Sequence, residues 1–119
     1  MSAPAGAGSG RFEPPYYAVI FTSELTEDTA DYGAIADRMV ELAAQQPGYL
    51  GIESARDGLG ITVSYWRDLP SIAAWRANLE HLEAQRRGKQ QWYRRYRLRI
   101  ARVERDWQFE RGGFGRGER

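Results

Sequence analysis

Hydrophobic and polar residues follow two different periods along the chain, and these periods predict its elements. The β-branched and aromatic run at residues 16–25, YYAVIFTSEL, predicts a central strand that is buried on both faces. Residues 26–48 place apolar side chains at helical spacing and end on Pro47-Gly48, so they predict a helix that stops there. Asp28 or Thr29 is the expected N-cap of that helix.

The second half of the chain begins with a predicted hairpin. Residues 49–56 and 61–67 alternate between apolar and polar side chains, and Asp57-Gly58 between them is a strong turn signal. A second helix follows, with Asp68 as its expected cap and Pro70 in its first turn. Gly88 interrupts this helix, and residues 89–96 can add another turn. The predicted apolar stripe of the helix consists of Ile72, Trp75, Leu79 and Leu82.

The last predicted element is a long strand over residues 97–110. Its apolar side chains change from even-numbered to odd-numbered positions between Ile100 and Ala101, which predicts a bulge or bend. The order is therefore β-α-β-β-α-β, the arrangement of ferredoxin-like α+β folds, with four antiparallel strands and helices on one face only. Nothing else in the chain can cover the other face, so we expect a second copy to cover it in a homodimer. The residues expected on one face of the last strand are Ala101, Val103, Trp107 and Phe109.

Length and charge bound the organisation and the partners of the chain. Its 119 residues indicate one domain, at residues 16–110, between a flexible leader at 1–15 and a flexible tail at 111–119. The formal charge is +1, and 12 of the 17 basic residues lie from Arg86 onward. Four acidic residues are interspersed there, so we interpret this region as a solvated or subunit-pairing face and expect no nucleic-acid partner.

Missing residue types and patterns exclude several kinds of site. There is no cysteine, which excludes disulfides, thiolate nucleophiles and cysteine-based metal sites. His81 is the only histidine, and because zinc usually needs three convergent ligands we expect no metal site. No apolar run approaches the roughly 20 residues of a membrane helix, and the N-terminus lacks the pattern of a secretory signal. We therefore expect a cytoplasmic protein with no membrane partner.

Three stretches of the sequence carry a further pattern, in which a glycine-led strand is followed by SYW and then by AAW…H…A…G. The stretches are YYAVIFTSELTED, PGYLGIESARDGLGITVSYWRDLPSIAAWRANLEHLEAQRRG and WYRRYRLRIARVERDWQF. Together they resemble the antibiotic biosynthesis monooxygenase domain family over about residues 16–110. The resemblance implies a dimeric α+β barrel, but it implies more than one activity.

Some members of the family oxidise phenolic or anthrone-type compounds with O₂ and no cofactor, whereas others bind and degrade haem. A related group isomerises small signalling molecules, and many members have no assigned activity. In the haem-degrading members a tryptophan on the second helix precedes the iron-binding histidine by about ten positions, and an asparagine ends the first strand. Counting from Trp75 leads to Gln85, and the strand position holds Ser23. We therefore expect no cofactor, with haem as the disfavoured alternative.

The resemblance suggests cofactor-independent oxidation of a small aromatic or quinol-like compound. A water-poor pocket, a group that hydrogen-bonds the phenolate and a base would suffice for this reaction. His81 is the expected base, since imidazole titrates near neutral pH, and Asn78 is expected to orient the substrate oxygen. Alternatively, His81 faces solvent and the tryptophans fill the core between helix and sheet. The domain would then be a non-catalytic small-molecule binder or a stress-associated protein. The candidate substrate-binding residues are Trp66, Trp75, Ser23, Trp92, Tyr93 and Tyr96, with Thr22 as a further hydroxyl.

Overall fold

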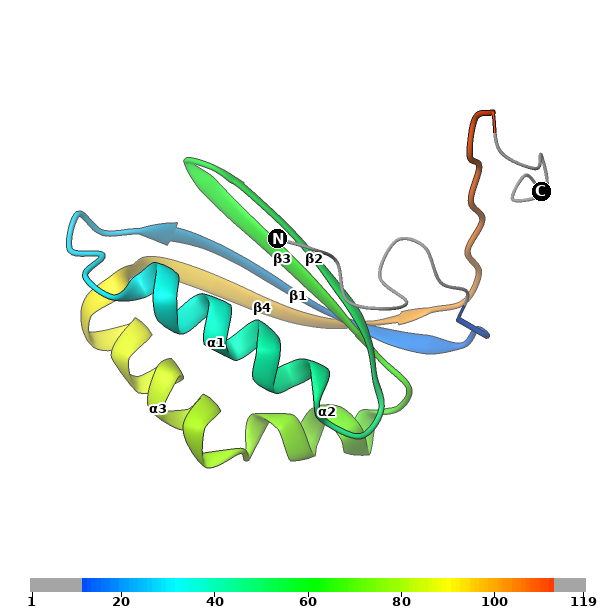
Figure 1. Ribbon diagram of the computed structural model, residues 1–119, viewed down its shortest axis with the longest axis horizontal. Coiled ribbons are helices and arrows are strands. Elements are labelled where there is room, and N and C mark those ends of the chain that lie inside the picture. The colour runs from blue at the N-terminus through cyan, green and yellow to red at the C-terminus, as the bar shows by residue number, and fades with distance from the viewer. Residues whose placement is uncertain (1–11, 113–119) are drawn as a thin grey trace.

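Four antiparallel strands form one sheet with the order β2-β3-β1-β4, and all helices lie on the same face of it (Figure 1). A computed structural model describes residues 12–112. The predicted β-α-β-β-α-β order and the ferredoxin-like α+β fold are therefore confirmed, with the second helix divided in two. The elements are β1 (Tyr16–Leu25), α1 (Tyr32–Ala44), β2 (Tyr49–Asp57), β3 (Leu59–Trp66), α2 (Leu69–Arg76), α3 (Leu79–Arg87), the π-helical turn η1 (Gly88–Trp92) and β4 (Tyr93–Val103).

Two local signals of the sequence act as predicted. Gly58 adopts a positive φ of 82° between β2 and β3, a conformation that glycine takes without steric cost, so the hairpin forms at Asp57-Gly58. Asp68 caps α2 by accepting a hydrogen bond from the Ser71 backbone N–H at 2.9 Å, and Pro70 lies in the first turn.

The predicted cap of α1 is wrong. The helix begins after Asp31, which has a φ of 67° and makes no side-chain capping bond. The Thr26 hydroxyl accepts from the Asp28 backbone N–H at 3.0 Å and so forms a local turn before the helix. Short polar side chains often favour such turns over helix, and here the turn delays the start of α1 to Tyr32.

The predicted single stripe across the second helix is also wrong. α2 ends at Arg76, and α3 begins after Asn78, so the two helices present different faces to the sheet. Leu79, expected in the core, is 82% exposed, and Leu82 is exposed as well. A capping residue in extended conformation restarts the helical phase, which a continuous 100° periodicity ignores.

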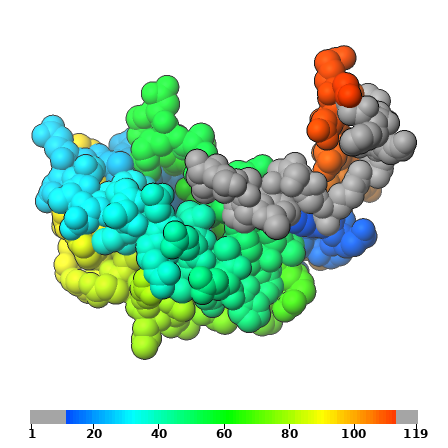
Figure 2. Space-filling view, in the orientation of Figure 1, coloured from blue at the N-terminus to red at the C-terminus, as the bar shows by residue number. Residues whose placement is uncertain are grey.

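The last strand begins earlier, is shorter and is more regular than predicted, because residues 93–96, expected in a helical turn, already belong to β4. β4 ends at Val103, and its register with β1 is continuous through Ile100 and Ala101, so no bulge lies there. The apolar positions change from even to odd numbers because the strand carries apolar residues on both faces: Ile100 lies on the helix-covered face and Ala101 on the other. The register shift lies instead between Glu24 and Leu25 of β1. Residues 104–112 leave the sheet. Asp106 still accepts a hydrogen bond from the Tyr16 hydroxyl of β1, and the chain after it stands away from the body of the domain (Figures 1 and 2).

The core lies between the sheet and the helices. Trp66 and Trp75 are its largest members, and Tyr17, Val19, Met39 and Tyr49 pack around it. Among residues 12–112 no helix or strand covers the opposite face of the sheet. Phe12 packs on Tyr16 and Tyr65 at one end of this face, and Leu59 and Ile61 are exposed toward the other end. No helix in this part of the chain is long and apolar enough to cross a membrane. The expected leader and tail lie largely outside the described residues. The buried core cluster is Leu42, Ala43, Trp66, Ile72 and Trp75.

Candidate functional site

Three aromatic rings stack in a row from the sheet to the start of α3. Trp66 and Trp75 lie with ring centroids 6.1 Å apart and planes 24° apart, and His81 follows at 4.0 Å and 13° from Trp75. Trp66 has no exposed surface, and its indole N–H donates to the Ser64 hydroxyl at 2.9 Å. Trp66 therefore supports the site from beneath, while Trp75 forms the surface on which the imidazole rests.

Asn78 places His81 on Trp75. Its side-chain oxygen accepts hydrogen bonds from the backbone N–H groups of Glu80 at 3.0 Å and His81 at 3.1 Å, which caps α3. The break in the helix turns His81 inward onto Trp75. The side-chain oxygen of Asn78 is thus engaged by the helix, and only its amide N–H groups are available to a ligand.

The surroundings of His81 define its tautomer and favour the neutral ring. Nδ1 lies 3.0 Å from the Trp75 carbonyl oxygen, which can only accept, so Nδ1 carries the proton and Nε2 holds a lone pair. Burial lowers the pKa of His81 below its ordinary value of 6.5, and nearby Arg76 lowers it further; the hydrogen bond to Trp75 opposes them. His81 is therefore a neutral base at pH 7.

Gln85, one turn further along α3, connects His81 to the surface. Its amide nitrogen lies 3.5 Å from Nε2 of His81, at the limit of a hydrogen bond. Gln85 also lines a shallow hollow of about 360 Å³ that opens beside α3 and η1. The Gln85 side chain therefore contacts both Nε2 of His81 and this hollow. The hollow is lined by Leu82, Gln85, Arg86, Lys89 and Gln90.

A second aromatic group lies at the far end of α3. Phe21 of β1 packs against Tyr93 at 5.3 Å and Tyr96 at 5.1 Å between ring centroids. Gly88 makes room for this group, because a Cβ there would lie 2.5 Å from the Tyr93 ring. Burial raises the pKa of Tyr93, and its hydrogen bond with Tyr32 acts in the same direction. Both tyrosines predicted at the site are thus brought together, and Tyr93 stays neutral.

Ser23 lies beside this aromatic group and is engaged by Arg56, which the sequence pattern does not single out. Its side chain is 1% exposed, and its hydroxyl accepts a hydrogen bond from Nη2 of Arg56 at 2.7 Å. The register of the hairpin at Asp57-Gly58 could have indicated Arg56, since it places this residue opposite Gly60. A glycine inside a strand often marks the close approach of another group.

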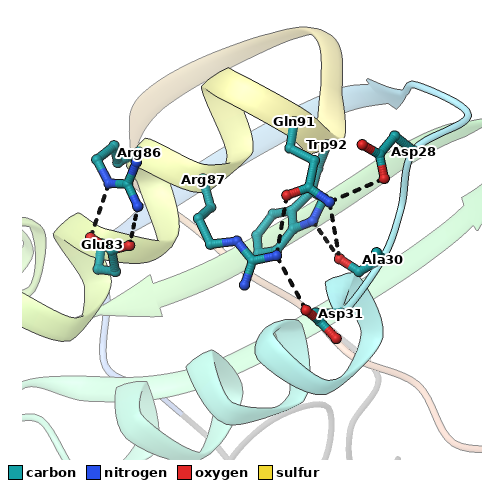
Figure 3. A network of polar contacts seen from close by, with 8 residues as sticks. All are labelled: Asp28, Ala30, Asp31, Glu83, Arg86, Arg87, Gln91 and Trp92. Atoms are coloured by element: carbon teal, nitrogen blue, oxygen red, sulfur yellow. Dashed lines mark hydrogen bonds and ion pairs between the residues drawn. The ribbon is translucent and has the colours of Figure 1, made fainter.

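Trp92, another predicted wall residue, belongs to a structural junction (Figure 3). It is buried, and its indole N–H donates to the Ala30 carbonyl oxygen at 2.9 Å. Arg87 lies over the Trp92 ring at 4.9 Å and reaches the Asp31 carboxylate at 3.3 Å, while Gln91 donates to Asp28 at 3.1 Å. These contacts fasten the end of α3 to the loop before α1, so Trp92 positions the helix.

An apolar strip on β4 remains uncovered on the helix side of the sheet. Leu98 lies opposite Phe21 and Ile100 opposite Val19, so both share the face that carries the core. They are nevertheless 37% and 44% exposed, and Tyr96 beside them is exposed as well. The helical layer therefore stops short of β4 and leaves apolar surface next to the aromatic group. Among residues 12–112 no group of three or more His, Asp or Glu side chains could hold a metal ion.

Comparison with known proteins places this architecture in a family. Residues 15–87 match the antibiotic biosynthesis monooxygenase family. "Uncharacterized protein YqjZ" of Bacillus subtilis is 52% identical over 100 residues, which cover 82% of this chain and 88% of that protein. Among solved structures, SnoaB of Streptomyces nogalater, "a cofactor-independent oxygenase", is similar with a TM-score of 0.67 and 11% identity over 77% of this chain and 96% of SnoaB.

The protein Rv0793 of Mycobacterium tuberculosis has the same TM-score of 0.67, with 15% identity over 76% of this chain and 96% of Rv0793. At such identities the structural likeness bears on the fold alone. The match over residues 15–87 and the 52% identical relative go further: the chain belongs to the antibiotic biosynthesis monooxygenase family.

Proposed function

We propose that the protein is a cofactor-independent monooxygenase that oxidises a small aromatic or quinol-like compound with O₂. The observation that carries this proposal is the state of His81. The ring is held on Trp75 with its proton on Nδ1, which leaves Nε2 as a neutral acceptor beside Gln85, a residue that lines a surface hollow. The similarity to SnoaB, itself described as a cofactor-independent oxygenase, supports the proposal.

The reaction needs no external electron donor. Nε2 of His81 takes a proton from the acidic C–H or O–H of the substrate, and the resulting carbanion or phenolate is electron-rich enough to reduce O₂. A bond forms between the reacting carbon and one oxygen atom, and the proton returns from His81 to the peroxide. Loss of the remaining hydrogen on that carbon with cleavage of the O–O bond yields a carbonyl and water. All four electrons come from the substrate.

Apolar surface on the helix-covered face suits these steps. The aromatic group of Phe21 and the adjoining strip of Leu98 and Ile100 lie beyond the far end of α3 from His81, and a bound substrate would cover this surface and exclude water from it. A developing negative charge would then depend on the few polar groups present. The amide N–H groups of Asn78 are the nearest predicted donors for a substrate oxygen. Trp75 keeps the imidazole in one orientation.

Haem chemistry fits these residues less well. The two positions that matter in haem-degrading members hold Gln85 and Ser23, and both side chains already contact protein groups. Gln85 lies against His81, and Ser23 is buried beneath Arg56. Neither residue offers an imidazole to iron, so haem has no part in the proposed reaction.

We further propose that the active form is a homodimer. The open face of the sheet is divided by charge, with Glu53 and Asp57 on β2 at one edge and Arg97 and Arg99 on β4 at the other. A two-fold axis parallel to the strands would lay β2 of one copy over β4 of the other, so these charges would meet their opposites. Exposed Ile61 lies between them.

Oxygen consumption tests the proposed activity. Purified protein is mixed in an oxygen electrode with dithranol, an anthrone, and separately with menadiol, a quinol. We expect protein-dependent uptake that falls about 100-fold or more in His81→Gln, the magnitude typical of removing a general base. Ligand binding without uptake above the buffer rate would favour the non-catalytic binder instead. A parallel hemin titration followed by ascorbate that gave a saturable Soret shift and then loss of the band would favour haem degradation.

A further inference from the structure

The side chain of Arg56 crosses the sheet from β2 to β1 over a gap that only glycine leaves open. Arg56 lies opposite Gly60 on β3, and Gly60 in turn lies opposite Ser23 on β1. A Cβ on Gly60 would lie 2.2 Å from both Cζ and Nη2 of Arg56. The guanidinium therefore rests against the Gly60 backbone, in a position that any larger residue would block.

One end of this guanidinium is held by the protein and the other end is not. Nη1 donates to the carbonyl oxygens of Ser23 at 3.2 Å and Gly58 at 3.5 Å, and Nη2 donates to the Ser23 hydroxyl at 2.7 Å. Within residues 12–112 the Nε–H makes no hydrogen bond and Arg56 has no carboxylate partner. Nη2 carries a second N–H besides the one given to Ser23, and together with the Nε–H it forms the edge of the guanidinium that can take a carboxylate through two parallel hydrogen bonds.

Aromatic rings stand beside this free edge. The Tyr32 ring centroid lies 5.9 Å from Cζ of Arg56, and Tyr93 lies 6.1 Å from Tyr32. Phe21 and Tyr96 continue the aromatic surface from Tyr93. A positive charge beside flat apolar walls selects a ligand that combines a carboxylate with a planar ring.

The distance to His81 sets the size of that ligand. Seven residues of helix separate His81 from Gly88, whose backbone touches the Tyr93 ring, and this corresponds to roughly 10 Å. A ligand that reaches from the aromatic group to His81 must extend over a comparable length, which favours fused rings over a single ring.

We propose that Arg56 binds the carboxylate of a fused-ring aromatic acid and so selects acids over neutral aromatic compounds. The part of this inference that brings the other end of the ligand to His81 rests on the proposed function. Binding of the carboxylate by Arg56 does not.

Calorimetric titration at pH 7.5 with 2-naphthoate and with its neutral isostere 2-naphthamide tests the proposal. We expect the acid to bind at least about tenfold more tightly, since hydrogen bonds to a charged group contribute more than neutral ones. In Arg56→Gln the acid should lose this advantage while the affinity for the amide stays within twofold. Equal affinities in the wild-type protein, or no binding of either compound, would overturn the proposal.

Three further variants separate this site from other effects. Gly60→Ala keeps the charge but displaces the guanidinium, and should also abolish the preference for the acid. Arg67→Gln removes an equal charge at the opposite end of β3 and should leave the preference intact. His81→Gln should lower oxygen uptake about 100-fold or more while the acid keeps its advantage over the amide, because this advantage depends on Arg56. A preserved acid preference in a protein that consumes no O₂ would support the Arg56 site and count against the oxygenase.

Discussion

The imidazole of His81 lies flat on the indole of Trp75, 4.0 Å between centroids, and donates from Nδ1 to the Trp75 carbonyl oxygen at 3.0 Å. One residue thus provides both the surface that His81 stacks on and the acceptor that defines its tautomer. The arrangement depends on the short break between α2 and α3, which brings a residue six positions later back onto Trp75.

The pH dependence of turnover should reflect the lowered pKa of His81. The neutral ring is the active base, and burial lowers its pKa below 6.5, so the decline of kcat/KM with falling pH should be centred below pH 6.5. Arg76→Gln removes one cause of the lowering and should shift this decline to higher pH. A decline centred above 6.5 in the wild-type protein would contradict the role of His81.

His81 should also make the free energy of unfolding depend on pH, with lower stability at lower pH. Protonation of His81 is less favourable in the folded state than in the unfolded state. The stabilisation that neutral His81 contributes to the folded state is therefore complete above pH 6.5, and it is lost as the pH falls through the lowered pKa of the folded state. Urea unfolding of the wild type and His81→Gln should show a difference that narrows between pH 7 and pH 5. A difference independent of pH would show that the ring contributes only by packing.

Substitutions of Asn78 should separate its capping role from any contact with substrate. Asn78→Ala removes the cap of α3 and should lower the free energy of unfolding by about 1 kcal/mol. Asn78→Asp keeps the capping oxygen but removes the amide donors, so its stability should match the wild type. If Asn78 orients the substrate oxygen, Asn78→Asp should nevertheless lose turnover, measured as kcat for oxygen uptake. Full turnover in this variant would limit Asn78 to the cap.

Trp66 and Leu79 should differ sharply in their effect on stability, although both are large apolar side chains. Trp66 has no exposed surface, so Trp66→Ala should cost about 3–5 kcal/mol in the free energy of unfolding. Leu79 is 82% exposed, so Leu79→Ala should change it by no more than about 0.5 kcal/mol. Urea unfolding curves check both, and a large effect at Leu79 would mean that this side chain is buried in the assembled protein.

Charge reversal should test the proposed homodimer. Glu substitutions of Arg97 and Arg99 place like charges against Glu53 and Asp57 of a second copy, so the double variant should be monomeric by sedimentation. A second double variant, Glu53→Arg with Asp57→Arg, should also be monomeric, whereas an equimolar mixture should form a heterodimer. Arg67→Glu with Lys89→Glu is the matched control, because both residues lie off the open face. Dimers in both open-face variants would contradict this interface.

Local patterns were sufficient for most of the architecture. The β-branched run of β1, the turn at Asp57-Gly58 and the cap at Asp68 each act within a few residues, so their outcome can be read from the order of side chains alone. Alternation and helical spacing then yield the element order and, through the rules of connection, the ferredoxin-like sheet.

Where local signals compete, the sequence alone was not sufficient. Asn78 can continue a helix or cap a new one, and the 100° periodicity of the flanking residues favoured continuation. Packing of Trp75 against Trp66 and the two hydrogen bonds of the cap favour the break, and this moves His81 inward and Leu79 outward. Ile100 and Ala101 mislead for a similar reason, since β4 carries apolar residues on both faces.

The sequence by itself therefore determined the strands, the hairpin, the fold and the chemical groups available, because these follow from short-range propensity and periodicity. Only the tertiary structure decided which groups meet: His81 on Trp75, and Arg56 across Gly60 onto Ser23. Arg56, Gly60 and Ser23 come from three different strands, and Ser23 and Arg56 are 33 positions apart in the sequence. Such contacts depend on strand register and on the space that one glycine leaves open, and neither quantity is local.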